Sequence, residues 1–325
     1  MRGERALAGL EQGRVARRAG ARASTAALGL VYLARGLALL RSAWPAYLLI
    51  ALVYAAPALL AAALTLTVAA PAPWLRVLID LLPWLTAILG TVAMMIAIGD
   101  GAHGRPVRLG RATAEGLRWT PRYLWTNAHT SLIFWLPMAL LAEARVWQET
   151  ALPLDGAAGL ALTMLWWLLI IGLGLSLHTR TLLAPFLAVH GDLPGTLATL
   201  EAWRLSGRHF ARCLVVLVLG SLPAALPLGL LALGSHLLLG EPAARALTLA
   251  GPALLWAAIQ VARPVLMPAV YALYTDLWSA EQARRAAEGA PPPPPLARLL
   301  LALTRWLPHL PAWRRGGRAT GAGLP

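Results

Sequence analysis

Charged side chains and cysteine are both scarce in this chain of 325 residues. Aspartate, glutamate, lysine and arginine together make up 13% of it, about half the fraction that is usual in soluble domains. The single cysteine, Cys213, excludes an intrachain disulfide and a cysteine-ligated metal cluster. Lysine is absent, so all 28 basic residues are arginine, a bias that suggests a GC-rich genome.

Hydrophobic residues, by contrast, account for 58% of the chain and fall into long blocks. A helix of about 20 mostly apolar residues is long enough to cross a bilayer. The blocks lack the alternation of polar and apolar residues that is typical of a membrane β-strand. We therefore predict an all-α, polytopic helical membrane protein with about six transmembrane helices. The apolar blocks lie at residues 44–70, 74–98, 123–142, 158–179, 210–234 and 246–274.

The sequence on either side of these blocks predicts three parts. Residues 1–43 form a basic N-terminal segment whose apolar end, interrupted by two arginines, favours an interfacial helix. Residues 44–275 form the six-helix transmembrane domain. Residues 276–325 form a tail in which five prolines at 291–295 favour an extended linker and 296–310 favours an amphipathic helix.

The arginines are divided unevenly between the two sides of the predicted domain. Of the 28, 23 precede the first block, follow the last one, or lie in the second-to-third and fourth-to-fifth connections. The opposite side has only Arg76, Arg145 and Arg245. Because cytoplasmic loops carry an excess of basic residues, we predict that both termini are cytoplasmic. The predicted location is the bacterial inner (plasma) membrane, whose anionic inner leaflet, rather than nucleic acid, accounts for the positive charge.

Two segments ahead of predicted spans match each other at an offset of 86 residues. The first, AEGLRWTPRYLWTNA, begins at residue 114, and the second, LEAWRLSGRHFARCL, begins at residue 200. Pro121 and Gly207 are equivalent, and we expect a bend into the span at both positions. Further along, Arg180 matches Arg263 at an offset of 83. These matches predict two parallel two-helix repeats, or three if the first hairpin is a diverged copy.

The matched segments, which we call the lead-in segments, concentrate charge on one helical face. A glutamate is followed by arginines three and seven residues later, and such positions share a face. We interpret these segments as interfacial helices that anchor the chain and set its topology. The alternative is a specific contact with an anionic lipid or with a partner at the headgroup level. The arginines concerned are Arg118, Arg122, Arg204 and Arg208.

Ionisable or strongly polar side chains at membrane depth are candidate functional residues by default. Arg76 and Asp80 are four residues apart, which favours a local ion pair. Arg180 and Arg263 are expected near the inner ends of their spans, where long side chains reach the interface. For Asn127 and His129 the ordinary role is hydrogen bonding between helices. No metal-binding spacing or hydrolase motif is present, so we predict no catalytic residue, metal or cofactor.

Two stretches resemble segments of known bacterial membrane proteins. EAWRLSGRHFARCLVVLVLGSLP, from residue 201, is similar to a repeated element of proteins related to the membrane domain of glycerophosphoryl diester phosphodiesterases. AVYALYTDLWSAEQARR, at 269–285, is similar to the ending common in that group, although Trp278 stands where arginine is usual. The similarity covers residues 100–285 and implies a multi-span helical fold. The catalytic domain of that family is absent, so the resemblance implies no activity.

These features predict a non-enzymatic integral membrane protein, a scaffold or a partner subunit that meets another membrane protein. The alternative is a permease or lipid-handling protein with a cavity among proline-kinked helices. A mid-membrane pocket lined by Asp80, Asn127 and His129 would favour transport, and a tightly packed interior would favour scaffolding. An enzyme would require His129, His178 or Asp100 to lie within hydrogen-bond reach of each other.

Overall fold

The computed structural model describes residues 25–67, 72–151, 156–238 and 240–288. The chain divides into two compact units, residues 1–276 and 277–325, and the division falls within the last helix. The predictions for the proline linker and for the helix at 296–310 lie outside the described residues, as does most of the basic N-terminal segment.

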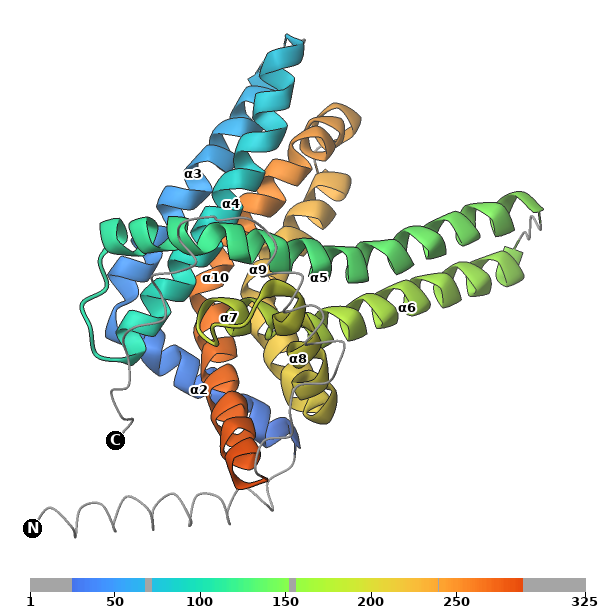
Figure 1. The fold of residues 1–325 in the computed structure, drawn as a ribbon. Helices are drawn as coiled ribbons and strands as arrows, with labels where there is room; N and C mark the ends of the chain where they lie inside the picture. Colours follow the sequence, from blue (N-terminus) through green and yellow to red (C-terminus); the bar gives the residue numbers. More distant parts are fainter. Residues whose placement is uncertain (1–24, 68–71, 152–155, 239, 289–325) are drawn as a thin grey trace, which may run out of the picture. The chain divides into compact units, whose positions relative to one another are not determined.

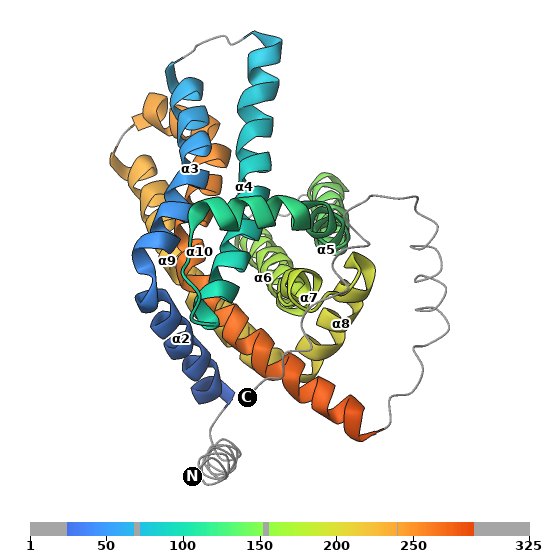
Figure 2. The same cartoon turned by 60° about the vertical axis from the view of Figure 1, so that its left-hand side comes forward.

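The described residues form helices and no strands (Figures 1 and 2). The predicted all-α fold is therefore confirmed for this part of the chain. The helices are α2 (Thr25–Ser42), α3 (Trp44–Thr67), α4 (Pro73–Ala102), α5 (Leu109–Ala151), α6 (Gly156–Thr181), α7 (Ala184–Val189), α8 (Gly195–Arg208), α9 (Phe210–Leu238) and α10 (Gly240–Ala287).

The helices α3 and α4 form an antiparallel hairpin, and α4 is the most enclosed long helix of the first unit. Every residue of α4 from Gly90 to Asp100 is buried. A Cβ atom at Gly90 would lie 2.7 Å from Cβ of Tyr54 in α3. A Cβ atom at Gly116 of α5 would lie 3.2 Å from the backbone nitrogen of Ala93 in α4. Small residues thus let α4 approach both neighbours closely.

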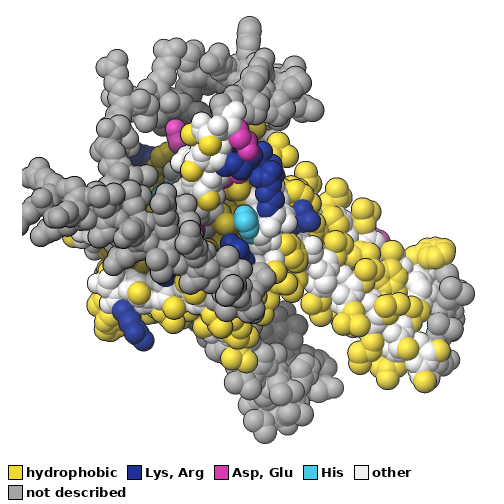
Figure 3. All heavy atoms as spheres, turned by 90° about the horizontal axis from the view of Figure 1, so that it is seen from below, with side chains coloured by type: hydrophobic (Ala, Val, Ile, Leu, Met, Phe, Trp, Pro, Cys, Tyr) yellow, Lys and Arg dark blue, Asp and Glu magenta, His cyan; other side chains and the backbone are white. Residues whose placement is uncertain are grey.

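The second hairpin, α5 with α6, contrasts with α4 in its exposure. The two helices run side by side in both ribbon views (Figures 1 and 2). Only 6% of the apolar stretch of α6 is buried, against 67% of that of α4. The outer surface of this hairpin therefore consists largely of large apolar side chains. Hydrophobic side chains, in yellow, are prominent there in the space-filling view (Figure 3).

The two lead-in segments differ in their path into the helix that follows. The chain bends by 100° between α8 and α9, with His209 at the break. This bend lies two residues beyond the predicted position at Gly207. The helix α5, however, continues through Pro121 without a break, and the bend expected there stays a prediction.

Within the described residues, four helices are long and apolar enough to cross a membrane, and the count is five if the bent pair α8–α9 forms one span. Each of the six predicted blocks lies largely within a helix, namely α3, α4, α5, α6, α9 and α10. The helix α5 does not reach the same apolar character because polar residues such as Asn127 and His129 interrupt its block. The number of six spans stays a prediction.

Candidate functional site

The C-terminal end of α4 meets α7 and α10, and polar groups gather where they meet. His190 follows α7, and its Nε2 donates a hydrogen bond to the backbone oxygen of Met95 in α4 at 3.1 Å. A Cβ atom at Gly99 would lie 2.8 Å from Cε1 of the same ring, so only glycine admits the imidazole here. The ring of Tyr271 in α10 stands edge-on to His190, with 5.2 Å between ring centroids.

Aromatic rings enclose the histidine from two helices. Phe186 of α7 stacks on His190 at 6.2 Å and on Tyr274 of α10 at 5.9 Å. We call Phe186, His190, Tyr271 and Tyr274 the aromatic cluster. Burial, together with the nearby His103, lowers the pKa of His190 to about 4, against the opposing effect of the bond to Met95. The imidazole is therefore neutral at physiological pH.

The buried carboxylate of Asp100 lies one residue from Gly99, at the end of α4. Its Oδ1 is 3.3 Å from a guanidinium nitrogen of Arg111 and 3.7 Å from one of Arg105. Arg111 also pairs with Glu115 at 3.5 Å. Both arginines are about half exposed, whereas the Asp100 side chain is only 6% exposed. The ion pairs therefore tie the α4–α5 connection to the end of α4 and compensate a buried charge.

A cavity of about 580 Å³ opens beside the aromatic cluster, between α2, α10 and the end of α4. Its wall is mostly apolar, with a smaller polar part. The lining residues are Arg35, Ala38, Leu39, Ser42, Gly101, Ala102, His103, Tyr271, Ala272 and Thr275. The buried hydroxyl of Tyr47, which has no hydrogen-bond partner within the described residues, lies against Gly101 on this wall.

The predicted headgroup residues of the first lead-in segment have different surroundings. Arg118 is exposed. The Arg122 side chain is only 12% exposed, and its Nε donates to the backbone oxygen of Leu193 at 2.8 Å. It also pairs with Asp192, which has a positive φ of 52°, at 2.5 Å. Arg122 therefore fastens the loop after α7 to α5, whereas Arg118 faces the surroundings.

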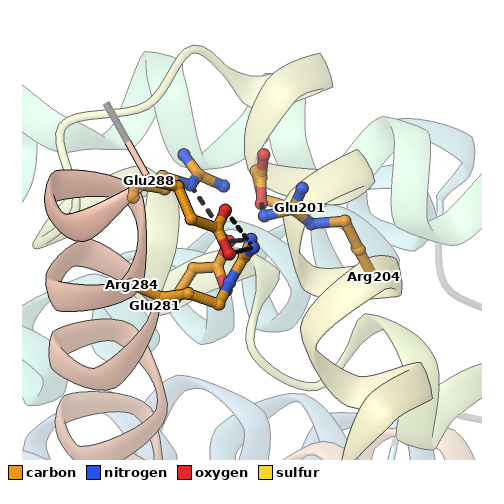
Figure 4. Close-up of polar contacts among 6 residues, drawn as sticks. Glu201, Arg204, Glu281, Arg284 and Glu288 are labelled. Carbon is orange, nitrogen blue, oxygen red and sulfur yellow. Dashed lines mark hydrogen bonds and ion pairs between the residues drawn. The ribbon is translucent and has the colours of Figure 1, made fainter. Parts of the chain in front are cut away.

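In the second lead-in segment, Arg204 and Arg208 of α8 are both exposed. Arg204 pairs with Glu201 at 3.4 Å. The closing part of α10, in the second unit, has its own set of ion pairs, in which Arg284 bonds Glu281 at 2.7 Å and Glu288 at 2.5 Å. Figure 4 shows both sets of residues.

The two matched arginines inside the helices both turn toward protein. The Arg180 guanidinium lies 5.0 Å from the ring centroid of Trp203, and the Arg180 backbone oxygen accepts a bond from Ser206 Oγ at 3.0 Å. Arg263 donates to the backbone oxygen of Ala87 in α4 at 2.7 Å and to the Gln260 side chain. Arg263 was expected to reach the membrane interface, but its guanidinium bonds the backbone of α4 and a side chain of its own helix, α10.

The remaining polar candidates do not come together. His129 bonds the backbone oxygen of Trp125 at 2.7 Å and Thr196 of α8 at 3.3 Å, so it links two helices as expected. Asn127 is partly buried on the same helix. Arg76 and Asp80 are exposed in α4, and among the described residues they form no ion pair, so the predicted pairing is wrong.

No local sequence pattern pointed to His190, Tyr271 or Arg35, because each stands alone in an ordinary stretch of sequence. Asp100 and His129, two of the residues of the enzyme alternative, have separate partners. His178 packs edge-on to Phe134 at 6.3 Å. Among the described residues, no three histidine, cysteine, aspartate or glutamate side chains are placed to hold a metal ion.

The buried His190 predicts acid sensitivity. Its pKa is about 4 in the folded protein, against about 6.5 for an exposed histidine. Its contribution to stability is complete above pH 6.5 and is lost as the pH falls from 6.5 toward 4, because the unfolded chain takes up the proton first. We expect a loss of about 3 kcal/mol across this window. Thermal unfolding in detergent at pH 7.5, 6, 5 and 4 measures it.

A matched pair of variants isolates this effect. His190→Gln should be less stable at pH 7.5 and should lose less stability than the wild type on acidification. His129→Gln, at a histidine outside the aromatic cluster, should keep the wild-type pH dependence. Equal slopes for the wild type and His190→Gln would contradict the assignment.

The site thus combines a neutral buried histidine, a compensated carboxylate and a partly polar cavity, all at the C-terminal end of α4. None of these groups is arranged as a nucleophile with a base. Comparisons of the chain with protein-family models, with curated proteins and with solved structures found no match.

Proposed function

We propose that this chain is a multi-pass protein of the bacterial inner membrane that acts, without catalysis, as a scaffold or partner subunit of a membrane complex. The observation that carries the proposal is the exposure of the α5–α6 hairpin. Leu132, Trp135 and Leu140 of α5 and Leu165 and Leu168 of α6 are each more than 60% exposed. Such a hairpin has little to pack against within its own chain.

Lipid alone is a poor explanation for this hairpin. Lipid tails are as apolar as leucine, so contact with lipid accounts for the exposed leucines. Tryptophan, however, is enriched at the two membrane interfaces, whereas Trp135 and Trp167 lie near the middle of the apolar blocks 123–142 and 158–179. Buried aromatic anchors, in contrast, dominate the energy of protein interfaces. The α5–α6 hairpin presents Trp135, Trp147 and Trp167 with half or more of each side chain exposed. These tryptophans could therefore pack against the helices of another membrane protein.

A parallel repeat is part of the same proposal, and three contacts support it. Ala93 of α4 packs on Gly116 in the first lead-in segment, and Arg180 of α6 contacts Ser206 in the second. Ala269 of α10 packs on Gly36 of α2, which precedes α3 as the lead-in segments precede their spans. In each case the second helix of a hairpin meets a lead-in helix. Such cyclic contacts are expected of three repeats in one orientation.

Site-specific photocrosslinking tests the proposed role. A photoreactive residue in place of Leu168 should give a protein adduct of one discrete mass in intact membranes. The control position is Ile50 of α3, which is 1% exposed and should give no adduct with another chain. Adducts with lipid only at Leu165, Leu168 and Trp135 would refute the scaffold role. An adduct of twice the mass of the chain would identify the partner as a second copy.

A further inference from the structure

The cavity between α2, α4 and α10 has the size and the lining of a ligand site. Its volume of about 580 Å³ falls within the range of small-molecule pockets, roughly 300–1,000 Å³. Its lining divides by chemistry. Arg35, Ser42, His103, Tyr271 and Thr275 supply polar groups, and small or aliphatic residues of the same three helices supply the rest. A ligand that fits is polar at one end and apolar at the other.

Hydrogen-bond donors remain free for a ligand in this cavity. Arg35 uses one nitrogen to bond Asp276 at 2.7 Å, and its side chain stays 54% exposed. A guanidinium has five N–H groups, so several remain. His103 donates from Nδ1 to the backbone oxygen of Gly99 at 2.7 Å, so its Nε2 donates to a ligand when the ring is in its imidazolium form. The hydroxyl of Tyr271 has no partner within the described part of the chain and lines the same wall.

The lining of the cavity favours an anion, because it includes Arg35 and no aspartate or glutamate. The carboxylates of Asp100 and Asp276 are paired with Arg105 and Arg35. Arg111 lies beside Asp100 and also pairs with Glu115, so it adds no net positive charge. The end of α4 carries partly negative carbonyl groups, which disfavour an anion. Three of them are bonded by the backbone N–H groups of residues 103–105, which weakens this effect.

We propose that this cavity binds a phosphate ester, with the phosphate at Arg35 and His103 and the apolar part of the ligand along α2 and α10. Arginine is the side chain best suited to a phosphate group because its planar fork matches two oxygens at once. The chemistry fits the headgroup of an anionic lipid and also a free phosphorylated small molecule. This site goes beyond the scaffold role and does not depend on it.

The test is binding to the full-length chain in detergent, measured by native mass spectrometry. The probes are phosphatidylglycerol, phosphatidylcholine at the same concentration, and glycerol 3-phosphate. We expect phosphatidylglycerol to bind more tightly than phosphatidylcholine, and Arg35→Gln to weaken it about tenfold, the effect of one charge-assisted hydrogen bond. The matched control is Arg41→Gln, which removes the same charge from the same helix outside the cavity and should bind like the wild type.

A second variant covers the case in which Arg35→Gln disturbs folding. Ala102→Trp fills the cavity from an exposed position, leaves all charges in place and should also abolish binding. Loss with both variants for phosphatidylglycerol alone supports a lipid headgroup, and loss for glycerol 3-phosphate supports a soluble ligand. Equal losses in Arg35→Gln and Arg41→Gln, or unchanged binding in Ala102→Trp, would overturn the proposal.

Discussion

Gly36→Leu is expected to destabilise the first unit by about 3 kcal/mol or more, as an overpacked helix contact does. A Cβ atom at Gly36 would lie 2.5 Å from the backbone nitrogen of Ala269 and 2.7 Å from its Cα. Backbone atoms of α10 cannot rotate aside as a flexible side chain can. Relief of the clash therefore requires α2 and α10 to separate. Thermal unfolding and the yield of monodisperse protein in detergent measure the loss.

The control for this variant is Gly172→Leu in α6. A Cβ atom at Gly172 has no heavy atom within 4 Å, and the residue is exposed. Leucine is a better helix former than glycine, by somewhat less than about 1 kcal/mol, so Gly172→Leu should be neutral or stabilising. If Gly36→Leu unfolds at the same temperature as Gly172→Leu, the close contact between α2 and α10 is absent.

Replacing both Arg204 and Arg208 with glutamate is expected to disturb the insertion of the helix that follows them. Both side chains are exposed on α8, where arginine faces the proposed anionic leaflet. The double change alters the charge by four, and each charge near such a surface is worth about 1 kcal/mol. The total of about 4 kcal/mol is large enough to change topology. A reporter fused after residue 245 should move from the outer to the inner side in a measurable fraction of molecules.

The matched control changes the same charge on the other side of the membrane. Arg76→Glu with Arg145→Glu should leave the reporter on the outer side, because acidic residues on that side do not oppose the orientation. Unchanged topology and unchanged yield in the Arg204→Glu, Arg208→Glu variant would count against the proposed orientation. That result would leave the helical fold unaffected.

The helical elements follow from local sequence. Apolar blocks of about 20 residues form helices in any environment that lacks water, because the backbone groups must then bond within the segment. The predicted blocks at 44–70 and 158–179 accordingly lie in α3 and α6 with ends displaced by only a few residues. The span through α5 was harder to define, since Asn127 and His129 lower the apolar character of the block.

The position of the break before α9 was predicted only to within two residues, because helix breaks depend on neighbouring helices. Pro121 has the residue type that breaks helices, yet α5 continues through it while Gly116 packs on α4. The break occurs instead after Arg208, where the N–H of His209 bonds the backbone oxygens of Leu205 and Ser206. A proline removes one backbone bond, and packing over many residues outweighs that loss.

The sequence by itself determined that this protein is helical, rich in apolar helices of membrane-spanning length and asymmetric in its arginines, because composition and length act through local hydrophobicity and charge. Only the tertiary structure brought Arg35, His103, His190 and Tyr271 to one end of the first unit. These residues come from four separate segments, each of them unremarkable in its own stretch of sequence. Contacts between distant segments arise from the packing of whole helices, and a single sequence contains no local pattern from which such packing can be predicted.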